Sequence, residues 1–141
     1  MRVHERPIIP KNKKPLRTGS WWELYDNGLL VVHCKGEMQI ELTQVALSDY
    51  TSEFNGSGTY FGRETFIEID KIIVCDGVTS LHKWLTYDGK VKSIEIPASV
   101  QKIECALIGA TIYTQKGSYA SQKYKVPNDY VTIIELENGE K

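Results

Sequence analysis

Two short segments in the middle of the chain carry the same pattern of apolar and polar positions. The first reads KIIVCDGVTSL and the second, further along the chain, reads SIEIPASVQKI. Their apolar positions match at a spacing of 22 residues, whereas the positions between them vary. The matched pairs are Ile72 with Ile94, Val74 with Ile96, Val78 with Val100, and Leu81 with Ile103. Apolar residues two positions apart predict a strand with one buried face, so each segment is interpreted as a strand, a turn and a return segment.

A repeat of this size cannot bury its apolar face alone, and it therefore has to stack on a neighbour. We expect Ile72 to lie over Ile94 as successive rungs of one β ladder. A third, shortened repeat follows, in which Ala110 and Ile112 match the inward positions of the second repeat at a spacing of 16 residues. The pattern predicts a mainly β fold with a minor helical part, built as a short solenoid.

The segment before the repeats predicts a β cap. Asp26-Asn27-Gly28 stands between two apolar runs, and Asn-Gly supplies the positive φ angles of a tight hairpin turn. Residues 36–47 fit either a strand or a loop. Residues 48–64 are rich in Gly, Ser and Asn and predict a loop.

The segment after the repeats predicts a second cap. Ser118 is a candidate N-cap for a helix over residues 119–125, and Pro127 stops that helix. The apolar run YVTIIEL, residues 130–136, predicts a closing strand.

These elements predict one domain, because 141 residues suffice for a single core of ordinary size. Residues 1–19 are expected to be a basic flexible tail, and residues 20–141 a single domain. Within that domain, residues 20–70 are expected to form the N-terminal cap, residues 71–109 the repeats, and residues 110–136 the C-terminal cap.

The order of these pieces resembles the BspA-type leucine-rich repeat family, whose repeats read roughly apolar-x-x-V-x-I-P-x-S-V-x-x-I. GVTSL, at the end of the first repeat, is similar to the family's first-repeat signature, and residues 111–125 are similar to its terminal segment. The second repeat matches at Val91, Ile94, Ile96, Pro97, Ser99, Val100 and Ile103. The first repeat matches at Ile72, Val74, Val78, Thr79, Ser80 and Leu81. The cap matches at Trp22, Leu24, Gly28, Leu29, Leu30, Val32, Gly36 and Met38.

The resemblance covers most of residues 21–136 and implies a leucine-rich-repeat-like solenoid. The chain departs from the pattern at Cys75, where proline is usual, and at Leu107, near where phenylalanine is common. Members of the family are often long, secreted surface proteins, whereas this chain has two clear repeats and no apolar leader. We therefore expect a cytoplasmic protein, with the cell surface as the alternative if the chain is a fragment.

Candidate catalytic and metal-binding residues form no recognisable pattern. His33 and Cys34 are neighbours in a predicted strand, so their side chains point to opposite faces. An approach of His82 to Cys75 or Cys105 would make a dyad, but packing explains these residues better. The three histidines lack metal-ligand spacing, and the glycine-rich GSGTYFG lacks the Lys-Ser/Thr of a phosphate loop. The sequence predicts no enzyme, no cofactor and no metal site.

The formal net charge of −1 hides an asymmetry along the chain. Residues 1–17 carry a net charge of +5, and the rest of the chain carries −6. A basic tail attracts phosphate backbones, but no aromatic side chain interleaves these charges for base stacking. Direct nucleic-acid binding is not expected apart from this tail, and the absence of a long apolar run predicts no membrane span.

The side chains that point away from the predicted core offer a contact surface, because they vary at no cost to packing. Together they mix apolar and polar groups, which is the usual anatomy of an interface. We predict a non-enzymatic protein-binding module. Its predicted contact residues are Ile73, Ser93, Glu95, Thr111, Tyr113 and the outward-facing Trp21. The closing strand, residues 130–136, offers an edge for strand addition or for a homodimer.

Two alternatives stay open. The acidic body could belong to an inhibitor-type protein, including one carried by a mobile element, that occupies a nucleic-acid-binding partner by mimicking phosphates. Alternatively, Trp21, Tyr50 and Tyr60 could form a carbohydrate-binding surface.

Overall fold

The structure of the 141-residue chain is a computed structural model. It describes residues 3–18, 22–37, 58–61, 65–82, 91–105, 107–124 and 131–137. This part of the chain is mainly strand with very little helix, as the sequence predicts. No helix in these ranges is long and apolar enough to cross a membrane.

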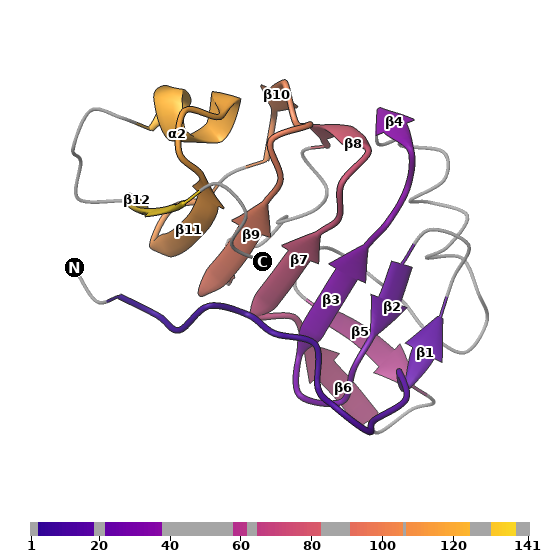
Figure 1. The fold of residues 1–141 in the computed structure, drawn as a ribbon. Helices are drawn as coiled ribbons and strands as arrows, with labels where there is room; N and C mark the ends of the chain where they lie inside the picture. The colour runs from indigo at the N-terminus through magenta and orange to yellow at the C-terminus, as the bar shows by residue number, and fades with distance from the viewer. Residues whose placement is uncertain are drawn as a thin grey trace.

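A seven-stranded main sheet forms the body of the molecule, in the order β1-β2-β3-β7-β9-β11-β12 (Figure 1). All neighbours from β3 to β12 are parallel, whereas β1, β2 and β3 pair antiparallel. The strands are β1 (Arg17–Thr18), β2 (Trp22–Leu24), β3 (Leu29–Val32), β7 (Lys71–Val74), β9 (Ser93–Ile96), β11 (Ala110–Gln115) and β12 (Val131–Leu136).

The predicted stacking of the two repeats is confirmed. Ile72 pairs with Leu30 on one side and with Ile94 on the other, and Ile94 pairs in turn with Ile112. Ile133 of β12 continues the same row beside Ile112. A row of β-branched and leucine side chains therefore runs across five neighbouring parallel strands, and the 22-residue spacing correctly predicts its step from Ile72 to Ile94. The spacing of 16 residues expected for the third repeat is wrong, because Ile112 pairs with Ile94 and not with Ile96.

A small parallel sheet, β10-β8-β4, closes one side of the main sheet. It contains β4 (Gly36–Glu37), β8 (Val78–Leu81) and β10 (Lys102–Ile103), each of which follows a main-sheet strand in the chain. The chain turns from β7 into β8 at Asp76-Gly77, where the φ angle of Gly77 is +104°, a value that favours glycine. Val78, Leu81, Val100 and Ile103 from this side and Ile72, Val74, Ile94, Ile96 and Ile112 from the main sheet form one buried core.

Both caps contain the elements that the sequence predicts, within a few residues. β2 and β3 pair as the predicted hairpin, with Gly28 at a φ angle of +89°, whereas the positive φ angle expected at Asn27 is wrong. The side chain of Ser118 accepts a hydrogen bond from the Ser121 amide and caps α2 (Tyr119–Lys123). The expected stop at Pro127 lies outside the described residues.

The expected loop over residues 48–64 is wrong at residues 58–61, and the rest of this stretch lies outside the described residues. Two strands, β5 (Gly58–Phe61) and β6 (Thr65–Glu68), pair antiparallel. Glycine and serine next to this segment masked the strand-forming run Thr59-Tyr60-Phe61 in the sequence.

The N-terminal segment also differs from expectation. Residues 3–10, called here the N-terminal segment, lie across the outer face of the main sheet, the face turned away from the small sheet (Figure 1). Further along, Leu16 donates to the carbonyl of Leu24, and β1 pairs with β2. The packed part of the chain thus begins well before the boundary expected at residue 20.

Candidate protein-binding face

The structure brings five of the six predicted contact residues together on the outer face of the main sheet. Glu95 of β9 pairs with Ile73 of β7 and with Tyr113 of β11, and Ser93 pairs with Thr111. They form two rows, because side chains two apart on a strand share a face. Trp21 lies outside the described residues.

The expectation that all five side chains are exposed is wrong. Ser93, Thr111 and Tyr113 keep only 1%, 0% and 9% of their surface accessible. Ile73 and Glu95 are half-buried. Alternation along the strands correctly separates these positions from the core, but it does not reveal that another part of the chain covers them.

The N-terminal segment is that cover, and side-chain contacts hold it in place. The His4 amide donates to Thr111 Oγ1 at 3.0 Å, and Tyr113 donates its hydroxyl to the His4 carbonyl at 2.6 Å. Arg6 Nε lies 2.7 Å from Glu95 Oε1, with both side chains about three-quarters buried. Pro7 is buried as well. The main chain of His4 and the charge of Arg6 are thus both recognised by the sheet.

Burial beneath this segment also changes the ionisation of Tyr113. Burial raises the pKa of the Tyr113 hydroxyl, the charge of Glu5 adds to the rise, and the charge of Arg6 opposes it. The hydroxyl therefore stays protonated at neutral pH and serves as a donor to the His4 carbonyl.

Sequence reasoning missed His4, Arg6 and Pro7 as parts of this face. The signal was the charge asymmetry: a segment of net charge +5 next to a body of net charge −6 favours docking.

Beside the N-terminal segment, a groove of about 390 Å³ remains open on the outer face. It lies where β7, β9, β11 and β12 reach their carboxyl ends. Its lining residues include the apolar Ile73, Pro97, Ala98 and Leu136, the polar Cys75 and Gln115, and the acidic Asp76 and Glu95. No basic side chain lines it among the described residues. The groove therefore combines apolar surface with negative charge.

Cys75 in this groove does not have the character of a catalytic nucleophile. Burial, and after it the charges of three nearby carboxylates, raises the pKa of the Cys75 thiol. A nucleophilic cysteine needs a lowered pKa, because the thiolate is the reactive form. Burial likewise raises the pKa of Cys34. Both raised pKa values favour the protonated thiol at neutral pH.

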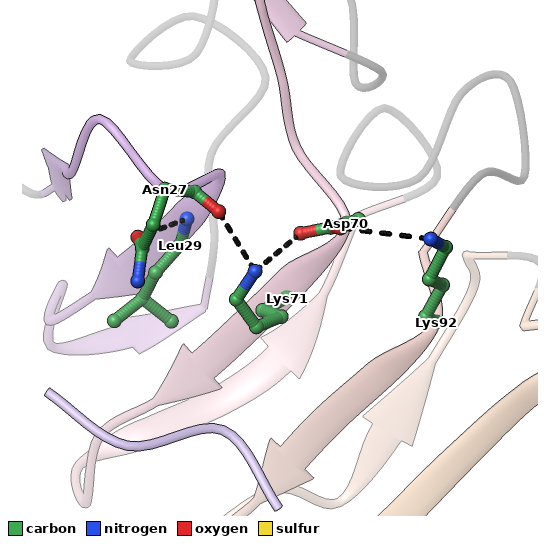
Figure 2. A network of polar contacts seen from close by, with 5 residues as sticks. All are labelled: Asn27, Leu29, Asp70, Lys71 and Lys92. Carbon is green, nitrogen blue, oxygen red and sulfur yellow. Dashed lines mark hydrogen bonds and ion pairs between the residues drawn. The ribbon is translucent and has the colours of Figure 1, made fainter. Parts of the chain in front are cut away.

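A polar network joins the opposite, amino ends of the strands (Figure 2). The Lys71 ammonium donates to the Asn27 carbonyl at 2.7 Å and to Asp70 Oδ1 at 2.8 Å. Lys92 Nζ lies 4.0 Å from Asp70 Oδ2, and the Asn27 side chain accepts from the Leu29 amide. Because Asp70 is set between two lysines, we interpret this cluster as a link between the hairpin turn and the first rungs of the ladder.

A metal site, a carbohydrate-binding surface and an edge for strand addition were also considered from the sequence. Among the residues that the structure describes, no three His, Cys, Asp or Glu side chains gather in a way that could hold a metal ion. Tyr50, like Trp21, lies outside the described residues, and the side chain of Tyr60 does too. Among the strands that the structure describes, β12 is the last in the order of the main sheet, which is the position expected for an edge strand. A homodimer through this edge stays a prediction.

Comparison with known proteins found no match. No family model matches the chain, and neither a curated protein nor a solved structure matches it.

Proposed function

We propose that this chain is a short solenoid of the leucine-rich-repeat type and serves as a non-enzymatic protein-binding module. The resemblance to the BspA-type repeats and the parallel ladder from β3 to β12 support the architecture. The contact surface is the groove at the carboxyl ends of β7, β9, β11 and β12, and not the whole outer face.

The groove is the observation that carries this proposal. Its volume of about 390 Å³ suits a few side chains of an extended segment better than a whole folded surface. Ile73, Pro97 and Leu136 offer apolar contacts, while Asp76 offers an acceptor for a cation and Glu95, which is paired with Arg6, borders the groove. The main-chain groups of interior strands are already paired in the ladder, so a partner has to be recognised by side chains.

The pairing of acidic side chains makes the phosphate-mimic alternative less favourable. Glu95 is paired with Arg6, Asp70 with Lys71, and Asp26 with Lys13. A phosphate mimic presents a row of uncompensated negative charges to its partner. These three acidic groups are instead partly neutralised by the chain itself.

The test is a selection of displayed random 12-residue peptides against the immobilised full-length chain. Ala98 is exposed and lines the groove, so Ala98→Trp fills the groove without removing core packing. Lys102→Trp is the matched control, because Lys102 is exposed on the small sheet. We expect the selected peptides to bind the wild type and Lys102→Trp, and to lose at least about tenfold in affinity for Ala98→Trp.

Thermal melting of the three proteins shows whether both tryptophan variants keep the fold. Selected peptides that bind Ala98→Trp as tightly as the wild type would place the binding surface elsewhere. A selection that enriches no peptide would count against a peptide-binding groove altogether.

A further inference from the structure

The N-terminal segment shows how the covered half of the outer face recognises an extended chain. Residues 3–10 belong to neither a helix nor a strand. Thr111 and Tyr113 bind the amide and the carbonyl of His4, so these two contacts are independent of the side chain at that position. Glu95 binds the guanidinium of Arg6, and this contact selects a cation. Buried Pro7 follows, and a proline fixes its own φ angle and favours an extended conformation for the residue before it.

The cover is held mainly by these polar contacts. Ile8 and Ile9, the apolar pair of the segment, keep 72% and 49% of their surface exposed, so they add little to its attachment. An ion pair that retains access to water contributes little more than about 1 kcal/mol. The tether adds to this attachment, because a short flexible linker corresponds to an effective concentration in the millimolar range.

We propose that the surface formed by Thr111, Tyr113 and Glu95 is a peptide-binding site for a partner protein, and that the N-terminal segment is its exchangeable intramolecular occupant. The partner segment is extended and carries a cationic residue followed by proline, the chemistry of Arg6-Pro7. It displaces the N-terminal segment.

Charge and position support the exchange. The body of the chain carries a net charge of −6, which favours a cationic ligand. Glu95 borders both this site and the open groove, so a partner segment longer than the chain's own can occupy both and gain contacts that residues 3–10 do not make. This inference rests on the proposed function, because the groove supplies that additional surface.

The experiment measures binding of a fluorescein-labelled synthetic peptide, RVHERPIIP, to the full-length chain by anisotropy. Arg6→Ala weakens the intramolecular occupant but leaves the site intact. Lys13→Ala is the matched control, because Lys13 forms an exposed ion pair with Asp26 away from the site. We expect Arg6→Ala to bind the peptide about fivefold more tightly than the wild type and Lys13→Ala do.

Two further variants test the role of the charge. Glu95→Gln placed in the Arg6→Ala chain is isosteric and is expected to remove the fivefold gain. A peptide with alanine in place of its central arginine is expected to bind Arg6→Ala more weakly than the parent peptide does, and to bind Arg6→Ala and the Arg6→Ala, Glu95→Gln chain equally. Both results would identify Glu95 as the group that selects the cation.

Several outcomes would overturn the inference. Equal peptide affinity for the wild type and Arg6→Ala, or no binding to either, would show that the segment does not compete for this site. A dimer of Arg6→Ala in light scattering would identify a second copy as the occupant. If groove-selected peptides bind the wild type and Arg6→Ala alike, the proposed function stands while this inference falls.

Discussion

The two faces of the main sheet are covered by different means. On the inner face, aliphatic side chains of the small sheet pack against Ile72, Ile94 and Ile112 in one core. On the outer face, the N-terminal segment covers Thr111 and Tyr113 through hydrogen bonds and one ion pair. The same strands thus carry a cover of aliphatic side chains on one face and, on the other, a cover that we propose a partner segment to replace. Burial alone therefore does not tell a core from a surface that another part of the chain covers through polar contacts.

The largest expected loss of stability comes from a substitution on the inner face. Ile94→Ala removes a side chain that is 0% exposed and stacked between two rungs, and we expect it to lower the free energy of unfolding by about 2–5 kcal/mol. Ile73→Ala, on the neighbouring strand and the outer face, removes a half-buried side chain and is expected to cost less than half as much. Urea denaturation of both variants measures the contrast. Equal losses would mean that the two faces contribute alike to stability.

A smaller effect tests how the outer cover is attached. Tyr113→Phe deletes the hydroxyl that donates to the His4 carbonyl, and we expect a loss of about 1 kcal/mol. Lys13→Ala serves as the control, because its partner Asp26 is exposed and the 3.4 Å ion pair is expected to contribute less than about 0.5 kcal/mol. Urea denaturation again supplies the measurement. A Tyr113→Phe protein as stable as the wild type would indicate that the cover is not held by this hydrogen bond.

The contrast between the two faces also explains which parts of the structure could be predicted from the sequence. Alternation along a strand is a local property, and the 22-residue spacing shows which strands are equivalent. Together they predicted the rungs at Ile72 and Ile94. The N-cap at Ser118 and the turn at Asn27-Gly28 were predictable for the same reason, since each is decided by neighbouring residues.

The cover over the outer face could not be found in this way. The contacts of His4 with Thr111 and Tyr113 join residues more than one hundred positions apart, and no local pattern encodes them. Alternation showed only that Ser93, Thr111 and Tyr113 point away from the core. Residues rich in proline and lysine are typical of mobile leaders, so composition favoured a tail where the structure has a docked segment.

The most direct test of this account is amide hydrogen exchange at His4 in the full-length wild type, followed by NMR. His4 donates its amide to Thr111 Oγ1, so we expect its exchange to be slowed at least about tenfold relative to an unstructured peptide of the same sequence. In Arg6→Ala this protection is expected to fall, while the amides of the ladder stay protected. Exchange of His4 at the rate of the free peptide would contradict the claim that the N-terminal segment occupies the outer face.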